Sequence, residues 1–217
     1  MAKKINAEIL TVMFIDIVSY TKTTTDLDRE NFNKLHDVFD SLCHSTFAEH
    51  SGKVIKKIGD AFLVTFKSAT TAVLCGKKLQ EEFWEYNKGR KSKNPLKIRV
   101  AIHAGEVLHR NGDIYGDTVN TTSRIESITK PGDVVFSEPV YTAMNKNEFS
   151  YTHIGLRKFK GVKRPLRIFR VLTKKDEILR RKKKIKRFWK KIKRVIFLVV
   201  LLLAIYFAYK YYSGLYF

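Results

Sequence analysis

Residues 53–66, KVIKKIGDAFLVTF, decide the fold that the sequence predicts, and the other elements are placed outward from them. β-Branched and aromatic residues on both sides of Gly59-Asp60 are typical of a β-hairpin with Asp60 at its tip. Lys56 lies on the incoming strand, so a carboxylate and an ammonium are expected near one edge of a sheet. A Gly-Asp turn and an edge lysine are also common without any function, so the hairpin alone does not define a site.

Strands and helices are predicted on both sides of this hairpin. Residues 8–17 are almost continuously apolar and β-branched, as expected of a strand buried on both faces, and Asp16 lies where that strand ends. Apolar residues then recur at helical spacing, and Asp26 or Asp28 can cap the start of this helix. Residues 68–84 predict a second amphipathic helix.

Residues 96–104 alternate in polarity as a half-buried strand does, and Asn111-Gly112 indicates a second hairpin. The order β, α, β, β, α, β predicts an α+β fold with a ferredoxin-like core, in which two helices cover one face of an antiparallel sheet. The elements predicted after this core are a helix at 117–129 and strands at 134–136, 151–159 and 166–172.

The composition fits one well-packed domain with an appendage. The chain has 217 residues, of which 44% are hydrophobic, and a formal net charge of +21. Cys43 and Cys75 are its two cysteines and form no Cys-x-x-Cys motif, so neither a disulfide framework nor a zinc site is indicated. Residues 1–6 carry no apolar core behind their charges, so a signal peptide is not expected.

About half of the excess charge lies in residues 173–194, where thirteen Lys or Arg stand against two acidic residues, a net charge of +11. Apolar residues such as Ile178, Ile185 and Trp189 recur at helical spacing among these charges, so residues 174–194 predict a basic amphipathic helix. Such a helix can lie on an anionic membrane surface, bind nucleic acid or join a partner helix.

The uncharged stretch that follows favours the membrane. Residues 195–217 predict a single transmembrane helix that anchors the chain in the bilayer, with Lys210 reaching outward among tyrosines; a buried dimerisation helix is the alternative. The positive-inside tendency would keep the catalytic domain, residues 1–173, in the cytoplasm and the basic helix against an anionic leaflet. Nucleic acid is not expected as a partner.

Two segments outside the hairpin carry further candidate polar groups. Asp16 and Asp60 are expected to converge at one edge of the sheet, and two carboxylates suit Mg²⁺, which keeps waters and a substrate phosphate in its other positions. A helix cap or turn is the alternative for Asp16. Asn120 and Arg124 are four residues apart on one helix face, which can hold a phosphate or ribose oxygen or be an ordinary solvated face.

Together these residues resemble the catalytic domain of the class III nucleotidyl cyclases over about residues 8–172. Four motifs carry the resemblance, and they occur in the order typical of that family. They are Phe14-Ile15-Asp16, Lys56-x-x-Gly59-Asp60, Ile102-His-Ala-Gly-Glu106, and the spacing of Asp113, Asn120 and Arg124. The sequence contains neither a P-loop nor a Gly-x-Gly-x-x-Gly motif, which excludes those two kinds of nucleotide site.

The resemblance implies a metal site and a base-reading pair. Asp16, the backbone of Ile17 and Asp60 would hold two Mg²⁺ or Mn²⁺ ions per site, one at the ribose 3′-hydroxyl and one along the triphosphate. Lys56 and Asp113 would read the purine, through adenine N1 and the exocyclic amine respectively.

The remaining matched residues would act on the ribose and the phosphates. The resemblance implies that Asn120 orients the ribose and that Arg124 stabilises charge on the α-phosphate in the transition state. Lys160 would meet the terminal phosphates.

The resemblance also implies a partner and a substrate. In this family the metal aspartates come from one subunit and the other contacts from its partner, so a homodimer with two equivalent sites is expected. Guanylyl members typically place Glu and Cys at the positions of Lys56 and Asp113, so the expected reaction converts ATP to cyclic AMP and pyrophosphate. The alternatives are a guanylyl or other nucleotidyl cyclase and a catalytically silent module that binds a nucleotide or a partner.

Overall fold

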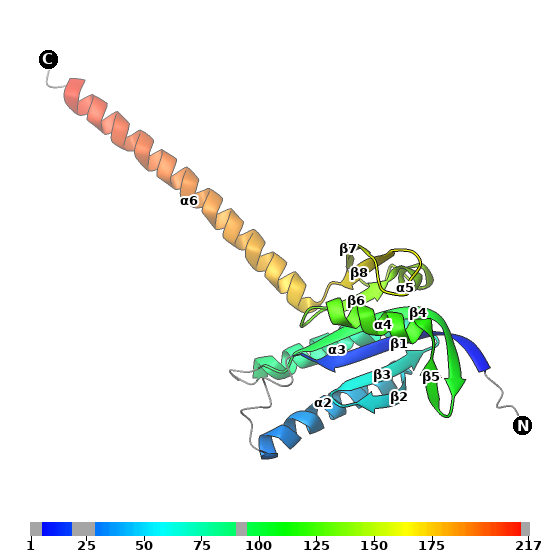
Figure 1. Ribbon diagram of the computed structural model, residues 1–217. Helices are drawn as coiled ribbons and strands as arrows, with labels where there is room; N and C mark the ends of the chain where they lie inside the picture. The colour runs from blue at the N-terminus through cyan, green and yellow to red at the C-terminus, as the bar shows by residue number, and fades with distance from the viewer. Residues whose placement is uncertain (1–5, 19–28, 90–94, 214–217) are drawn as a thin grey trace, which may run out of the picture. The chain divides into compact units, whose positions relative to one another are not determined.

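The computed structural model describes residues 6–18, 29–89 and 95–213 (Figure 1). The chain divides into two units, residues 1–173 and residues 174–217. The described part of the first unit forms one eight-stranded sheet with four helices, and the described part of the second is a single helix, α6 (Lys174–Ser213).

The strands are β1 (Asn6–Ile17), β2 (Lys53–Ile58), β3 (Ala61–Phe66), β4 (Ile98–Arg110), β5 (Asp113–Tyr115), β6 (Val134–Ser137), β7 (Tyr151–Arg157) and β8 (Leu166–Val171). Their order in the sheet is β2-β3-β1-β4-β6-β8-β7, with β5 paired to the end of β4. β1 lies inside the sheet with side chains such as Val12 and Ile15 fully buried, because its run of apolar residues meets packed elements on both faces. The β2–β3 hairpin predicted around Gly59-Asp60 is confirmed.

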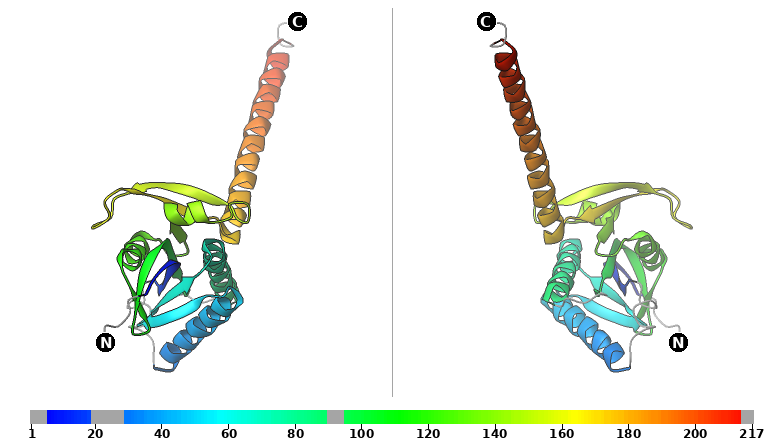
Figure 2. Two further views of the ribbon diagram at one scale, coloured as in Figure 1. Left: turned by 90° about the vertical axis from the view of Figure 1, so that its right-hand side faces the viewer. Right: turned by 90° about the vertical axis from the view of Figure 1, so that its left-hand side faces the viewer.

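The helices of the first unit are α2 (Arg29–Glu49), α3 (Ala69–Gly89), α4 (Asp117–Ile128) and α5 (Glu138–Ala143). α2 and α3 pack on each other and cover one face of the sheet, as predicted (Figure 2). Phe39, Phe62 and Phe83 meet in that layer, and burying a side chain of this size contributes about 1.5–3 kcal/mol. α3 begins just after Ser68, whose Oγ accepts the backbone N–H of Thr71.

The opposite face of the sheet is covered by α4 and by the β4–β5 hairpin. β4 extends beyond β6, and the hairpin turns back so that β5 contacts β2, although β1 and β3 lie between β4 and β2 in the sheet (Figure 1). Buried contacts among Leu63, Val107 and Ile114 hold the hairpin in this position. The second predicted hairpin, at Asn111-Gly112, is therefore confirmed and covers the sheet.

The predicted order of the core, β1-α2-β2-β3-α3-β4, is confirmed, but two features of the first unit differ from the prediction. β6 pairs parallel to β4, so the complete sheet is mixed rather than antiparallel. The short helix α5, which begins with Glu138-Pro139, was not predicted. The capping role proposed for Asp26 or Asp28 falls outside the described residues.

The predicted transmembrane anchor, and with it the membrane localisation, is wrong. Among the described residues no helix combines the length and the apolar character needed to cross a bilayer. The uncharged run between Arg194 and Lys210 has fifteen residues, about 22 Å of helix, whereas the hydrocarbon core is about 30 Å thick. Residues 214–217, which the prediction needed to reach the full span, lie outside the described part of the chain.

Candidate active site

Asp16 and Asp60 come together at one end of the sheet. Asp16 pairs with Ala61, the first residue of β3, and Asp60 immediately precedes Ala61 in the β2–β3 turn. Gly59 supplies the positive φ of 61° that this turn requires. Burial, and then the negative charge of Asp16, raise the pKa of Asp60 above its ordinary value. The two carboxylates are therefore close enough to repel each other.

Arg99 and Glu126 complete a cluster of charges around Asp16. The Arg99 guanidinium donates from Nε and Nη2 to Asp16 Oδ2, at 2.8 and 2.5 Å, and it also pairs with Glu126. Arg99 lies opposite Asp16 in the register of β1 and β4, and α4 supplies Glu126. We call Asp16, Asp60, Arg99 and Glu126 the carboxylate cluster.

The carboxylate cluster has more carboxylates than cations. Burial raises the pKa of Glu126 to about 7; Arg99 opposes this shift, while Asp16 and Asp60 add to it. A divalent cation would relieve the repulsion between these carboxylates, and carboxylate oxygens are the ligands that Mg²⁺ and Mn²⁺ prefer. The residues present therefore fit such an ion.

The protein ligands available for a metal are few. Within the described ranges, no three His, Cys, Asp or Glu side chains are arranged to hold a metal ion together. The predicted ligand set, two aspartates and the backbone of Ile17, needs only two such side chains. Ile17 is the last residue of β1, next to Asp16, and pairs with Ile98 of β4.

Sequence reasoning missed Arg99 and Glu126. Arg99 is the single charged residue in the run from Ile98 to Ile102, and a charge within a largely buried strand is a signal that could have been followed. The meeting of Arg99 with Asp16 depends on the register of β4 against β1, which the sequence does not specify. Glu126 gave no signal beyond its place on a predicted helix.

Lys56 and Asp113, which are 57 positions apart in the chain, form an ion pair. Lys56 Nζ donates to Asp113 Oδ2 at 2.5 Å, and Asp113 Oδ1 accepts the backbone N–H of Ile114 at 2.8 Å. Burial tends to raise the pKa of Asp113, but these hydrogen bonds lower it below its ordinary value. The carboxylate is therefore ionised near neutral pH. Lys56 Nζ also lies 6.0 Å from the centre of the Tyr115 ring.

Asn120, Arg124 and Lys160 lie on or beside α4. Asn120 and Arg124 are one turn apart on that helix, with Asn120 exposed and Arg124 half-buried. Arg124 Nη1 is 3.4 Å from the point that a Cβ on Gly161 would occupy, so the guanidinium lies against the loop that carries Lys160. Phe159 fixes this loop by packing into a buried cluster with Ile125 of α4.

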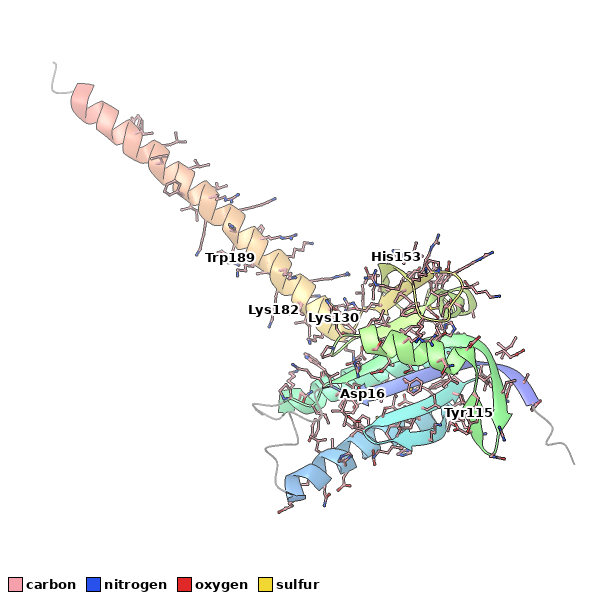
Figure 3. All side chains as sticks on the ribbon, in the orientation of Figure 1. Asp16, Tyr115, Lys130, His153, Lys182 and Trp189 are labelled. Carbon is pink, nitrogen blue, oxygen red and sulfur yellow. The ribbon has the colours of Figure 1, made fainter. Side chains whose placement is uncertain are left out.

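The predicted site residues thus fall into separate groups within one chain. In the part of the chain that the structure describes, no hydrogen bond or ion pair joins the carboxylate cluster to Lys56, Asp113, Asn120 or Arg124. Figure 3 shows Asp16 on the sheet well apart from Tyr115, which stands on β5 beside the Lys56–Asp113 pair.

A cavity of about 460 Å³ lies away from all of these groups. It is bordered by Glu8 and His109, at the end of β1 opposite to Asp16, and none of the predicted site residues lines it. The candidate site therefore rests on the charged residues themselves and not on this cavity.

Comparison with known proteins decides the family. Residues 3–175 match the adenylate and guanylate cyclase catalytic domain. The chain belongs to this cyclase family. The match contains every site residue named above, and it extends over the sheet and its four helices.

Two curated proteins and one solved structure illustrate the similarity of this cyclase domain. The serine/threonine-protein kinase pkn2 of Myxococcus xanthus is 32% identical over 169 residues, which cover 78% of this chain and 20% of that protein. The putative adenylate cyclase 3 of Rhizobium meliloti is 26% identical over 171 residues, 78% of this chain and 29% of that protein. The chain therefore spans less than a third of the length of these relatives.

The solved structure is an adenylate/guanylate cyclase/hydrolase from Silicibacter pomeroyi. It superimposes with a TM-score of 0.69 at 26% identity, and the similarity covers 78% of this chain and 99% of that one. The described fold, including the mixed sheet, is thus that of a cyclase catalytic domain.

Proposed function

We propose that this cyclase domain is an adenylyl cyclase, which converts ATP to 3′,5′-cyclic AMP and pyrophosphate at sites shared between two copies of the chain. The observation that carries the choice of ATP is the Lys56–Asp113 pair, with its 2.5 Å ion pair. The relatives named adenylate cyclase in Rhizobium meliloti and Streptomyces coelicolor support the same substrate.

The Lys56–Asp113 pair suits adenine because it offers one donor and one acceptor side by side. The Lys56 ammonium can donate to adenine N1, which carries no proton, while the ionised Asp113 accepts from the exocyclic amine. Guanine presents a protonated N1 and a carbonyl oxygen at these positions. A wrong base would leave groups unpaired, at about 1–3 kcal/mol for each group.

Asp16 and Asp60, with the backbone of Ile17, are the proposed ligands for two Mg²⁺ or Mn²⁺ ions. These ions would lower the pKa of the ribose 3′-hydroxyl and neutralise charge on the triphosphate. Arg99 holds the Asp16 carboxylate in a fixed orientation, and Glu126 holds Arg99. The chain thereby orients its metal ligands before substrate arrives, which reduces the cost of ordering them during the reaction.

Asn120, Arg124 and Lys160 are proposed to position the reacting groups. In-line attack of the 3′-oxygen on the α-phosphorus requires a fixed ribose, and an Asn120 amide can bond its oxygens. The planar guanidinium of Arg124 suits the charge that develops on the α-phosphate. Because Arg124 lies against the Lys160–Gly161 loop, Arg124 and Lys160 can reach the same triphosphate.

Two copies are proposed to share each site, because within one chain the carboxylate cluster and the Lys56–Asp113 pair make separate sets of contacts. The lack of bonds between the carboxylate cluster and the Lys56–Asp113 pair among the described residues supports a homodimer in which each copy supplies one set to each site. Each hairpin of β2 and β3 would then serve two sites, with Asp60 in one and Lys56 in the other.

Turnover by the purified full chain tests this function. ATP, GTP, CTP and UTP are supplied separately with Mg²⁺ or Mn²⁺, and the cyclic product and pyrophosphate are measured, with Asp60→Ala as the control. Cyclic AMP formation that Asp60→Ala abolishes supports the proposal. Cyclic GMP as the main product would favour a guanylyl cyclase, and nucleotide binding without any product would favour a catalytically silent module.

A further inference from the structure

The helix α6 carries a long series of exposed apolar side chains. Ile185, Val195 and Leu202 are 56%, 59% and 65% exposed in the single chain. Exposed apolar side chains that follow one line along a helix are typical of a surface that is covered in the assembled protein. Neither the cyclase fold nor the proposed active site accounts for them.

Some of these side chains follow a seven-residue repeat, whereas others, such as Phe197 and Leu201, lie outside it. Ile178, Ile185 and Ile192 are seven residues apart, and Phe188, Val195 and Leu202 form a second series that begins three residues after Ile185. The two series occupy positions a and d of a heptad, the spacing of a coiled-coil seam. Within parallel coiled coils, a β-branched residue at successive a positions is typical of pairs rather than of three or four helices.

We propose that α6 pairs in parallel and in register with α6 of a second copy of this chain, through the seam at Ile178, Ile185, Phe188, Val195 and Leu202. Pairing buries the side chains that the single chain leaves exposed. The contact is made by the residues outside the cyclase domain, so it does not depend on turnover of ATP.

The charges of α6 allow this pairing in spite of the net charge of +11 on residues 173–194. In a parallel pair each g residue meets the e residue five positions further along the partner helix. Glu177 would then meet Lys182 of the second copy, an attractive pair, and Lys184 would meet Trp189, a pair without repulsion. Lys182 and Trp189, which are labelled on α6 in Figure 3, occupy successive e positions.

One residue of the seam is charged. Arg181 takes a d position, and Glu177 lies four residues before it on the same helix, the favourable order for an ion pair. The long side chain of arginine can also reach out of the seam into water. The other lysines and arginines of this region lie mainly at b, c and f, on the outer side of a helix pair.

The antiparallel arrangement fits the same residues poorly. It would place the basic half of α6 against the uncharged half that follows Arg194, so that Lys184 and Lys191 at g would face Ile205 and Leu198. In the parallel pair only Lys191 meets an aliphatic residue in this way, at Ile196. A lysine beside an apolar side chain has no charge to pair with and must reach past it to water. The parallel arrangement instead keeps the apolar halves together.

Disulfide formation in the full-length protein tests the seam. Cys43 and Cys75 are buried, so a cysteine introduced on α6 is the accessible thiol. Under mild oxidation, Ile178→Cys, Ile185→Cys and Leu202→Cys are each expected to form a covalent dimer, because in-register a and d residues meet their own copies. Lys183→Cys, at an outer f position, is the matched control and should give roughly fivefold less dimer or lower.

Other outcomes would contradict the pairing. Residues 178 and 202 are about 36 Å apart on a helix, so an antiparallel pair cannot link both positions to themselves, and dimer at a single position alone would overturn the parallel register. Equal cross-linking of Lys183→Cys and Ile185→Cys would overturn the seam. Absence of any covalent dimer would leave α6 to another occupant, such as an acidic protein or a nucleic acid.

The charge pairing has a separate test in the Ile185→Cys protein. Glu177→Lys should reduce the yield of covalent dimer because it puts two lysines opposite each other, and adding Lys182→Glu should restore the yield. Equal yields in all three proteins would show that Glu177 does not meet Lys182 of the second copy. Turnover under reducing conditions is measured alongside, so that loss of pairing and loss of catalysis are seen as different results.

Discussion

Lys56 of β2 and Asp113 of β5 form a 2.5 Å ion pair although β3 and β1 separate β2 from β4, the strand that carries β5. The β4–β5 hairpin makes the contact possible by turning back over the sheet, where Ile114 packs into a buried cluster. Packing of the hairpin thus fixes the position of a pair that is proposed to read the purine.

We expect the Lys56–Asp113 pair to control the choice of nucleotide. Lys56→Ala should lower kcat/KM for ATP by about 10- to 100-fold, since one lost bond to the base is worth about 1–3 kcal/mol. Lys56→Glu combined with Asp113→Cys should raise the ratio of GTP to ATP turnover. The ratio is obtained from initial rates with ATP and with GTP, and Lys57→Ala on the same hairpin is the control. An unchanged ratio in the double variant would remove these residues from base recognition.

Arg99 is expected to stabilise the fold by compensating partly buried carboxylates. Arg99→Ala leaves Asp16 and Glu126, whose side chains are only 14% and 16% exposed, without their cation. Breaking a buried ion pair typically lowers the free energy of unfolding by about 3–5 kcal/mol. Because Arg99 is partly exposed, we expect a decrease of about 3 kcal/mol or less. Thermal denaturation should therefore show a clearly lower Tm.

A divalent cation should partly replace the missing guanidinium. Addition of Mn²⁺ is expected to raise the Tm of Arg99→Ala more than that of the unaltered protein, because the carboxylate cluster then contains no competing cation. Arg157→Ala, an exposed arginine of β7, is the control and should show no extra response. The same Mn²⁺ shift in all three proteins would argue against cation binding at Asp16 and Asp60.

The sequence predicted the elements of the cyclase domain well because their patterns are local. The alternation around Gly59-Asp60 and the apolar run before Asp16 each depend on neighbouring residues alone. The contact between Arg99 and Asp16 depends instead on the register of β4 against β1, which local sequence patterns do not specify. They also do not specify that β6 runs parallel to β4.

The error at the C-terminus had a different origin. The prediction needed residues 195–217 to act as one apolar span, but Lys210 interrupts the run and the fifteen uncharged residues before it are too few. The heptad spacing of this helix offers a different explanation for part of its apolar surface. Ile178, Ile185 and Ile192 continue into Val195 and Leu202 at coiled-coil positions, so pairing of helices accounts for these apolar side chains without a bilayer.

His103 should make the stability of the cyclase domain depend on pH. Burial lowers the pKa of His103 from 6.5 to about 4, and its Nδ1 lies 2.7 Å from Ser137 Oγ. Between these two pKa values the unfolded chain binds a proton that the folded chain does not. The free energy of unfolding should therefore fall as the pH falls from 6.5 to 4, by up to about 3 kcal/mol.

Comparison with His103→Gln isolates this effect. Glu126, with a pKa raised to about 7, acts in the opposite direction over part of the same range, so the absolute pH profile mixes the two groups. Urea denaturation of both proteins at several pH values gives the difference in unfolding free energy. This difference should change between pH 6.5 and 4 and stay constant above pH 7.5. A difference that does not vary with pH would show that His103 titrates alike in both states.

Shared active sites predict that two inactive chains can restore each other. Asp16→Ala removes a metal ligand and Arg124→Ala removes a phosphate contact, and each homodimer would have two defective sites. If one copy supplies Asp16 and the other supplies Arg124, a mixed dimer has one site with both defects and one intact site. At equal concentrations random pairing makes half of the dimers mixed, so activity should recover to about one quarter of the unaltered rate.

The mixing experiment also distinguishes shared sites from sites within one chain. The two variants are mixed after dissociation and reassociation, and cyclic AMP formation is measured against each variant alone. Asp16→Ala mixed with Asp60→Ala is the matched control, because both changes affect the carboxylate cluster and each of the two sites of the mixed dimer would still lack one aspartate. Recovery with Arg124→Ala and none with Asp60→Ala is the expected result. No recovery in either mixture, with dimers present, would mean that a single chain forms the whole site.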